Sequence, residues 1–312
     1  MILNFFKNSP PVIQGVFSGL LSSILSILSV EIPFIGLIAG IFFPLPLYII
    51  SLSQGIQSGL TGIVISIIIT SFLLGSLTAC AYLAFQFIPL ILVVYLFLKK
   101  NSSEQWTYSL GEVVSRTTAI FMFAIIVGLS ILIYCFPQWQ DFSSQVFKGK
   151  GHYSFGAQEH FNHLMEWLFP LVSLSIIGTC FLNWASAYFI LNKYELNLRT
   201  IVKKDWVAPF YWDIILTCGI MVWIAVRFLT FKEILPIAKT VIVLSCIPLA
   251  FIGFRICYLR LLYLRNGQQI FRILCLLSFF LVWPITFIVL LGFIEPWYRL
   301  TERLSVSQEE SL

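Results

Sequence analysis

The sequence predicts an all-α fold, a polytopic bundle of transmembrane helices. Of its 312 residues, 59% are hydrophobic and only 11% are charged, whereas soluble domains carry about 25% charged residues. Four runs contain no charged residue and are each long enough for one bilayer crossing, namely 8–30, 117–140, 167–192 and 273–294. A longer uncharged run, 32–98, leaves room for about three crossings. Lipid is therefore the solvent expected around most of the chain.

These runs and two weaker ones predict about nine spans, near 12–30, 34–52, 60–75, 77–98, 113–135, 165–192, 207–227, 235–257 and 271–294. Eight spans, with 227–257 partly re-entrant, are the alternative. Lys and Arg are more frequent in the loops that lie inside if the N-terminus is inside, so the positive-inside rule predicts a cytoplasmic N-terminus. Trp and Tyr gather near the predicted span ends, as they do at membrane interfaces.

The first span, 12–30, has a face of small residues. Its apolar stretch is longer than the core of a cleavable signal, so we expect it to remain in the membrane. The face is made of Gly15, Ser18, Gly19, Ser22 and Ser23, and Gly15 with Gly19 forms a G-x-x-x-G motif. Small residues let helices approach closely in lipid. Packing on another helix of the chain and docking to another membrane subunit both remain open.

The second span, 34–52, is predicted to be broken. Pro44 and Pro46 each remove a backbone N–H and disfavour helix at the preceding residue. Polar side chains follow, including Ser53, Gln54 and Gln57. Irregular backbone inside a membrane is tolerated only where protein buries it or where it lines a wet cavity. The alternative to a cavity is a kink that only fits the packed bundle.

Two polar residues in later spans are expected to face the same cavity as the broken span. Asn183 lies near the middle of span 165–192, and Asp213 lies near the start of span 207–227. Polar groups at this depth are costly in lipid and suggest function. The hypothesis is a small-molecule site lined by the proline break, by Asn183 and by Asp213.

The remaining loops and spans carry weaker signals. Spans 60–75 and 77–98 lie within the long uncharged run, and span 113–135 begins beside Glu112 and Arg116, which can pair at i, i+4. The outer loop 136–164 contains all three histidines, and "EHFNHLMEW" favours an interfacial helix over a metal site. The seven cysteines lie in apolar segments and predict buried thiols rather than ligands. Basic residues in 193–206 and 255–272 mark topology or attract anionic headgroups.

Four stretches carry a resemblance to a known family: "FFPLPLYIISLSQG" (42–55), "WTYSLGEVVSR" (106–116), "CFLNWASAYFILN" (180–192) and "LGFIEPWYRLTER" (291–303). Their order and spacing resemble the YybS-like family of bacterial polytopic membrane proteins. That family is similar in fold to the substrate-binding S components of energy-coupling-factor transporters. The resemblance implies a six-helix S-component-like bundle over 1–192, a three-helix extension with a short polar tail over 193–312, and a bacterial cytoplasmic (inner) membrane location.

Three classes of function are compared: a solute-binding or transport protein, a membrane interaction or assembly factor, and a membrane enzyme. The broken span and the buried polar groups favour a protein that binds or transports a small solute. The small-residue face favours the alternative, a non-transporting membrane interaction or assembly factor that contacts another membrane subunit through span one. No nucleophile–base or metal constellation is visible, so no enzyme activity, cofactor or metal is predicted. The expected partners are the lipid bilayer and a small solute, without nucleic acid.

Overall fold

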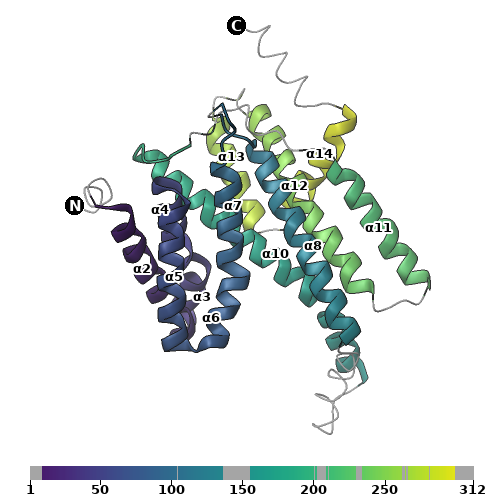
Figure 1. The fold of residues 1–312 in the computed structure, drawn as a ribbon. Helices are drawn as coiled ribbons and strands as arrows, with labels where there is room; N and C mark the ends of the chain where they lie inside the picture. Colours follow the sequence, from purple (N-terminus) through teal and green to yellow (C-terminus); the bar gives the residue numbers. More distant parts are fainter. Residues whose placement is uncertain are drawn as a thin grey trace. The chain divides into compact units, whose positions relative to one another are not determined.

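A computed structural model describes residues 9–103, 105–135, 155–199, 201, 209, 211–229, 234–261, 264, 266–280 and 282–298 (Figure 1). Over these residues the protein is helical and has no strand, and the only strand-like pairing is an isolated bridge between Lys100 and Trp106. The predicted all-α class is therefore confirmed for this part of the chain.

Seven of the described helices are long and apolar enough to cross a membrane, which fits an integral membrane protein. They are Pro11–Glu31, Ile56–Leu74, Ser76–Leu98, Leu110–Ile131, Trp167–Lys193, Tyr211–Phe228 and Leu235–Leu261. Two further apolar helical stretches are shorter: Ile38–Gln54, which runs across the turn at Phe43 and Pro44, and Pro284–Tyr298. The predicted count of nine is not confirmed: seven of the described helices are long enough, and the segment expected as span 34–52 consists of two shorter helices.

The chain forms two compact units, each made of two separate segments. Unit 1 comprises Met1–Ser109 with Ser175–Lys203, and unit 2 comprises Leu110–Leu174 with Lys204–Leu312. Each unit is described by itself below. The boundary expected at residue 192 from the family resemblance remains a prediction.

Unit 1 contains α2 (Pro11–Glu31), α3 (Pro33–Phe42), α4 (Leu45–Gln54), α5 (Ile56–Leu74), α6 (Ser76–Tyr82), η1 (Leu83–Phe87), α7 (Ile88–Leu98) and the second half of α10 (Phe155–Lys193). α2 packs against α3, α4 and α5, and α4 and α5 also contact α7 (Figure 1). The helix α4 is central to this packing, since its Leu47, Ile50 and Leu52 are almost completely buried.

Two glycines separate consecutive helices of unit 1. Gly55 has φ +94° between α4 and α5, and Gly75 has φ +91° between α5 and α6. A side chain with a Cβ atom is strained at such φ values, so these positions favour glycine.

A π-helical turn, η1, precedes Pro89 in α7. Ile88 N–H donates to the Leu83 carbonyl, five residues back. Pro89 has no N–H, and its ring would crowd the carbonyl of Phe85 in a regular helix. A π turn relieves this conflict without ending the span.

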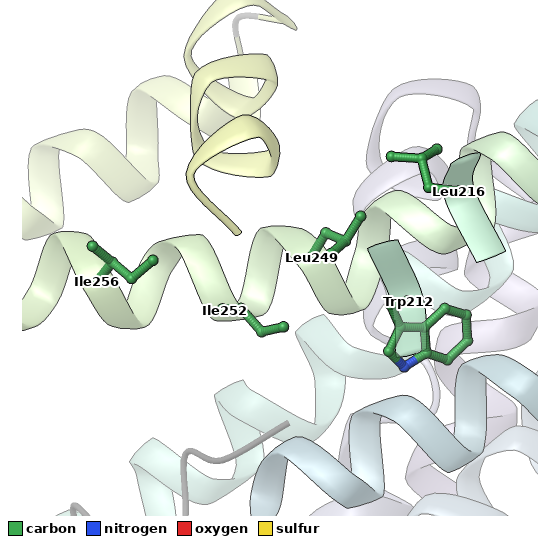
Figure 2. Close-up of a cluster of buried hydrophobic side chains, with 5 residues drawn as sticks. All are labelled: Trp212, Leu216, Leu249, Ile252 and Ile256. Atoms are coloured by element: carbon green, nitrogen blue, oxygen red, sulfur yellow. The ribbon is translucent and has the colours of Figure 1, made fainter. Parts of the chain in front are cut away.

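Unit 2 contains α8 (Leu110–Cys135), the first half of α10, α11 (Tyr211–Leu229), α12 (Leu235–Leu261), α13 (Gly267–Phe280) and α14 (Val282–Tyr298). α12 contacts α8, α11, α13 and α14 and is the central helix of the unit. Its core cluster, shown in Figure 2, comprises Trp212, Leu216, Leu249, Ile252 and Ile256.

The helices α12 and α14 cross at very short range. A Cβ atom added at Gly253 would collide with the Ile288 carbonyl, and one added at Gly292 would collide with the Leu249 carbonyl. The two backbones meet directly because neither crossing position carries a side chain. This is the close approach that small residues permit between membrane helices.

Candidate functional site

The predicted break of the second span lies at Phe43 and Pro44, between α3 and α4. The N–H groups of Leu47 and Tyr48 both donate to the Pro44 carbonyl, at 3.0 and 3.1 Å. Pro46 stands in the first turn of α4, where a missing N–H costs nothing. The prolines therefore end one short helix and begin another in the middle of the apolar segment.

Asn183 of α10 reaches this break. Its Nδ2 donates to the Ile41 carbonyl at 2.7 Å and to the Thr179 carbonyl at 2.8 Å. Ile41 stands at the end of α3, where carbonyl groups lose their intrahelical partners. Asn183 therefore supplies from another helix a hydrogen bond that the broken span cannot make for itself.

One polar atom of Asn183 remains without a partner. The side chain is 0% exposed, and its Oδ1 accepts no hydrogen bond from any described residue. The next residue, Trp184, is also buried, and its Nε1–H likewise has no described acceptor. Two consecutive residues of α10 thus each bury a polar group without a described partner: the Asn183 acceptor Oδ1 and the Trp184 donor Nε1–H. Burying such groups without partners costs on the order of 1–3 kcal/mol each.

A second polar contact joins α4 to α10 beside Asn183. The Tyr48 hydroxyl and the Cys180 thiol are hydrogen-bonded at 2.8 Å, and both side chains are buried. Cys180 and Asn183 are separated by three positions, so they lie on the same side of α10. The candidate site therefore consists of the Phe43–Pro44 turn, Tyr48, Cys180 and Asn183.

The other residues of the predicted cavity lie elsewhere. Ser53 is buried, and its hydroxyl donates to the Ile50 carbonyl of its own helix. Gln54 is half-buried at the end of α4, and Gln57 is exposed in the first turn of α5. Ser53 stands about 14 Å along the helix from Pro44 at the usual rise of about 1.5 Å per residue. The structure thus brings Asn183 to the Ile41 carbonyl, three residues before Pro44, and it leaves Ser53 and Gln54 at the far end of α4 and Gln57 in α5.

Asp213 belongs to unit 2, so the part of the hypothesis that joins it to Asn183 remains a prediction. Asp213 is buried in the first turn of α11.

The small-residue face of α2 packs on α5. A Cβ atom added at Gly15 would lie 2.6 Å from the Ser58 carbonyl oxygen, and one added at Gly19 would collide with the Gly62 carbonyl. The hydroxyl of Ser23 donates to that of Ser66 at 3.4 Å, and Ser18 and Ser22 are buried on the same side. Another subunit that contacts α2 would meet its outer apolar face instead.

Potential metal ligands do not cluster in the described residues, where no group of three His, Cys, Asp or Glu side chains could hold an ion. The side chains of His160, His163 and Glu166 lie outside the described part, so the interpretation of that segment remains a prediction.

Sequence reasoning missed Tyr48, Cys180 and the buried Arg199 of unit 1. A tyrosine in an apolar span is not distinctive by itself, and Cys180 was interpreted only as a small buried residue. Arg199 lies in a loop rich in charged residues, where arginine usually faces water. Only Cys180 could have been found from the sequence, because its spacing of three residues from Asn183 places both on one face of the same predicted helix.

Comparison of the chain with protein-family models, curated proteins and solved structures finds no match. The fold and the arrangement of residues therefore stand on the structure itself, and the family resemblance remains a prediction.

Proposed function

We propose that this integral membrane protein binds a small polar solute against the broken second span of unit 1, in the manner of a transporter S component. The observation that carries the proposal is Asn183, whose buried Oδ1 has no described partner although its Nδ2 is held by two carbonyl groups. A solute with a hydrogen-bond donor would satisfy this acceptor. The proposed location is a bacterial inner membrane, with the N-terminus in the cytoplasm.

The surroundings of Asn183 have the composition of a small-molecule site. Such sites have mostly apolar and aromatic walls with a few fixed polar groups. Here Phe43 and Tyr48 are buried near the break, and the Tyr48 hydroxyl is held by Cys180. The Asn183 amide is fixed in orientation by its two donated hydrogen bonds, so its free acceptor would be presented without further ordering.

A native thiol provides the test. In a variant that keeps only Cys180, a small cationic methanethiosulfonate should modify the thiol in the folded protein, because a solute site must be reachable from water. A small-molecule extract of the source cells should slow the reaction several-fold, and Asn183→Leu should remove that protection.

Cys246 of α12 offers a matched control, since its thiol is partly buried in a membrane helix of unit 2. In a second variant that keeps only Cys246, modification of this thiol should not change when the extract is added. If Cys180 stays unreactive while unfolded protein is labelled fully, the break is packed and dry. The prolines then only kink the bundle, and the proposal of a solute site is wrong.

A further inference from the structure

The chain forms a closed loop directly after α7, and two lysines stand in it. The Thr107 N–H donates to the Lys99 carbonyl at 2.8 Å, and Lys100 forms a backbone bridge with Trp106. The helix before the loop belongs to Ser76–Leu98, which is long and apolar enough to cross a membrane. Both lysines therefore stand immediately beyond an apolar span, where lipid headgroups are expected.

Aromatic rings hold both ammonium groups. The Lys100 Nζ lies 4.9 Å from the centroid of the Trp106 ring. The Lys99 Nζ lies 5.5 Å from the ring centroid of Tyr95 and 5.7 Å from that of Tyr108. A hydrogen bond with the Tyr95 side chain raises the pKa of Lys99, so this lysine is charged at neutral pH. An aromatic face attracts a cation but carries no net charge. The rings thus orient the two positive charges without neutralising them.

Two more cations stand at the same end of unit 1. The Phe97 ring of α7 packs edge-on against the Tyr188 ring of α10, with the centroids 6.3 Å apart. The ends of α7 and α10 therefore lie together, and α10 ends five residues later at Lys193. The buried Arg199 donates to the Phe97 carbonyl, and its guanidinium carbon lies 5.4 Å from the Trp106 ring. The basic end of unit 1 thus comprises Lys99, Lys100, Lys193 and Arg199.

Carboxylates do not balance these charges in the described part of unit 1. The acidic residues described there are Glu195, close to Lys193 in the sequence, and Glu31, which ends α2 at the other end of the unit, beside the end of α5. Exposed apolar side chains accompany the cations, namely those of Tyr194 and Leu198. Cations beside exposed apolar groups suit a lipid, because its anionic headgroup contacts the former and its acyl chains the latter.

We infer that the basic end of unit 1 binds the phosphate headgroup of an anionic phospholipid of the surrounding membrane. Clusters of about four to eight basic residues next to a span are typical of sites for anionic lipids. Lys99 and Lys100 donate to the phosphate oxygens, and the buried Arg199 adds to the positive potential behind them. The inference is independent of the proposed solute site, because it uses none of the residues of that site.

Native mass spectrometry of the purified full-length protein in a neutral detergent tests the inference, because it counts bound lipid molecules. Dioleoylphosphatidylglycerol should bind at least about tenfold more tightly than dioleoylphosphatidylcholine, which has no net charge. Lys100→Gln should weaken phosphatidylglycerol binding about fivefold, the contribution of one lysine near an anionic surface. Adding Lys99→Gln should bring the loss to about 25-fold. Binding of phosphatidylcholine should not change in either variant.

Arg227→Gln is the matched control, since Arg227 is an exposed cation of unit 2 whose guanidinium carbon lies 6.0 Å from the Trp223 ring. It should leave phosphatidylglycerol binding unchanged, and Lys100→Arg should retain it. Equal affinity for the two lipids would overturn the inference, as would an equal loss in Lys100→Gln and Arg227→Gln. Displacement of the lipid by an equal concentration of glycerol 3-phosphate would assign the site to a soluble phosphate. Tighter binding of polyglutamate than of phosphatidylglycerol would assign it to an acidic protein segment. Either result excludes the lipid.

Discussion

Arg199 is a buried guanidinium whose described hydrogen bonds end on backbone carbonyl oxygens. Its Nη1 donates to the Phe97 carbonyl at 2.7 Å, and its Nη2 donates to the Tyr108 carbonyl at 2.8 Å. The Phe97 ring lies 4.7 Å and the Trp106 ring 5.4 Å from the guanidinium carbon. Phe97 is in the last turn of α7, where carbonyl groups have no intrahelical partner. Arg199 therefore caps α7 from a distant segment of the chain.

Replacing Arg199 by lysine should destabilise unit 1 although it keeps the charge. An ammonium group lacks the planar fork that reaches two carbonyls, so at least one buried acceptor would lose its partner. We expect a loss of about 2 kcal/mol in the free energy of unfolding, measured in detergent. Arg260→Lys, at an exposed position of α12, is the control and should have little effect. Equal stability of Arg199→Lys and the wild-type protein would show that the cap is unimportant.

At the scale of residues, the sequence identifies a polar group only where its surroundings make it unusual. Asn183 stands out because apolar residues surround it along the chain, and the structure places it at the proline break. Arg199 does not stand out, since its neighbours in sequence are charged. The hydroxyl groups of Ser115, Thr117 and Thr118 in α8 are hidden for another reason. A helical hydroxyl usually donates to its own backbone, and only the structure shows that these three have no hydrogen-bond partner among the described residues.

At the scale of elements, glycine positions determine how closely helices of unit 2 cross. Gly253 and Gly292 stand where α12 and α14 touch through their backbones, whereas a Cβ atom added at Gly128 of α8 would meet nothing within 4 Å. Gly292→Ala should therefore cost about 1–3 kcal/mol through overpacking. Gly128→Ala should be neutral or slightly stabilising, because alanine favours helix. Thermal unfolding in detergent compares the two variants. Equal melting temperatures would contradict the close backbone contact between α12 and α14.

The elements that were predictable from the sequence are those set by local composition. Length and hydropathy predict the helices at Pro11–Glu31 and Ile56–Leu74, because one bilayer crossing needs little more than an apolar run. The place where the second predicted span divides is harder to foresee. Pro46 stands in the first turn of α4, where it requires no N–H partner, so the two prolines are compatible with a kink or with a new helix start.

The whole molecule combines segments that are distant in the sequence. The Leu198 N–H donates to the Leu52 carbonyl near the end of α4 at 3.1 Å, which ties the segment after α10 to the first helices of unit 1. Sequence reasoning interpreted that segment as a topology marker. Charge statistics report on which side of a membrane a loop lies. They carry no information on which helix ends the loop covers.

Orientation in the membrane follows from the same charge bias and is the prediction that concerns the molecule as a whole. With the N-terminus inside, the loop around Asn101 should face the cytoplasm and the loop around Lys150 should face the outside. In a protein without native cysteines, Lys150→Cys should react with an impermeant maleimide added to intact cells. Asn101→Cys should react only after permeabilisation, and it serves as the matched control because Asn101 is exposed. If the two variants exchange their behaviour, the orientation is reversed. If both react from outside, the number of spans between the two positions is even, and the assignment of α8 (Leu110–Cys135) as a single crossing is wrong.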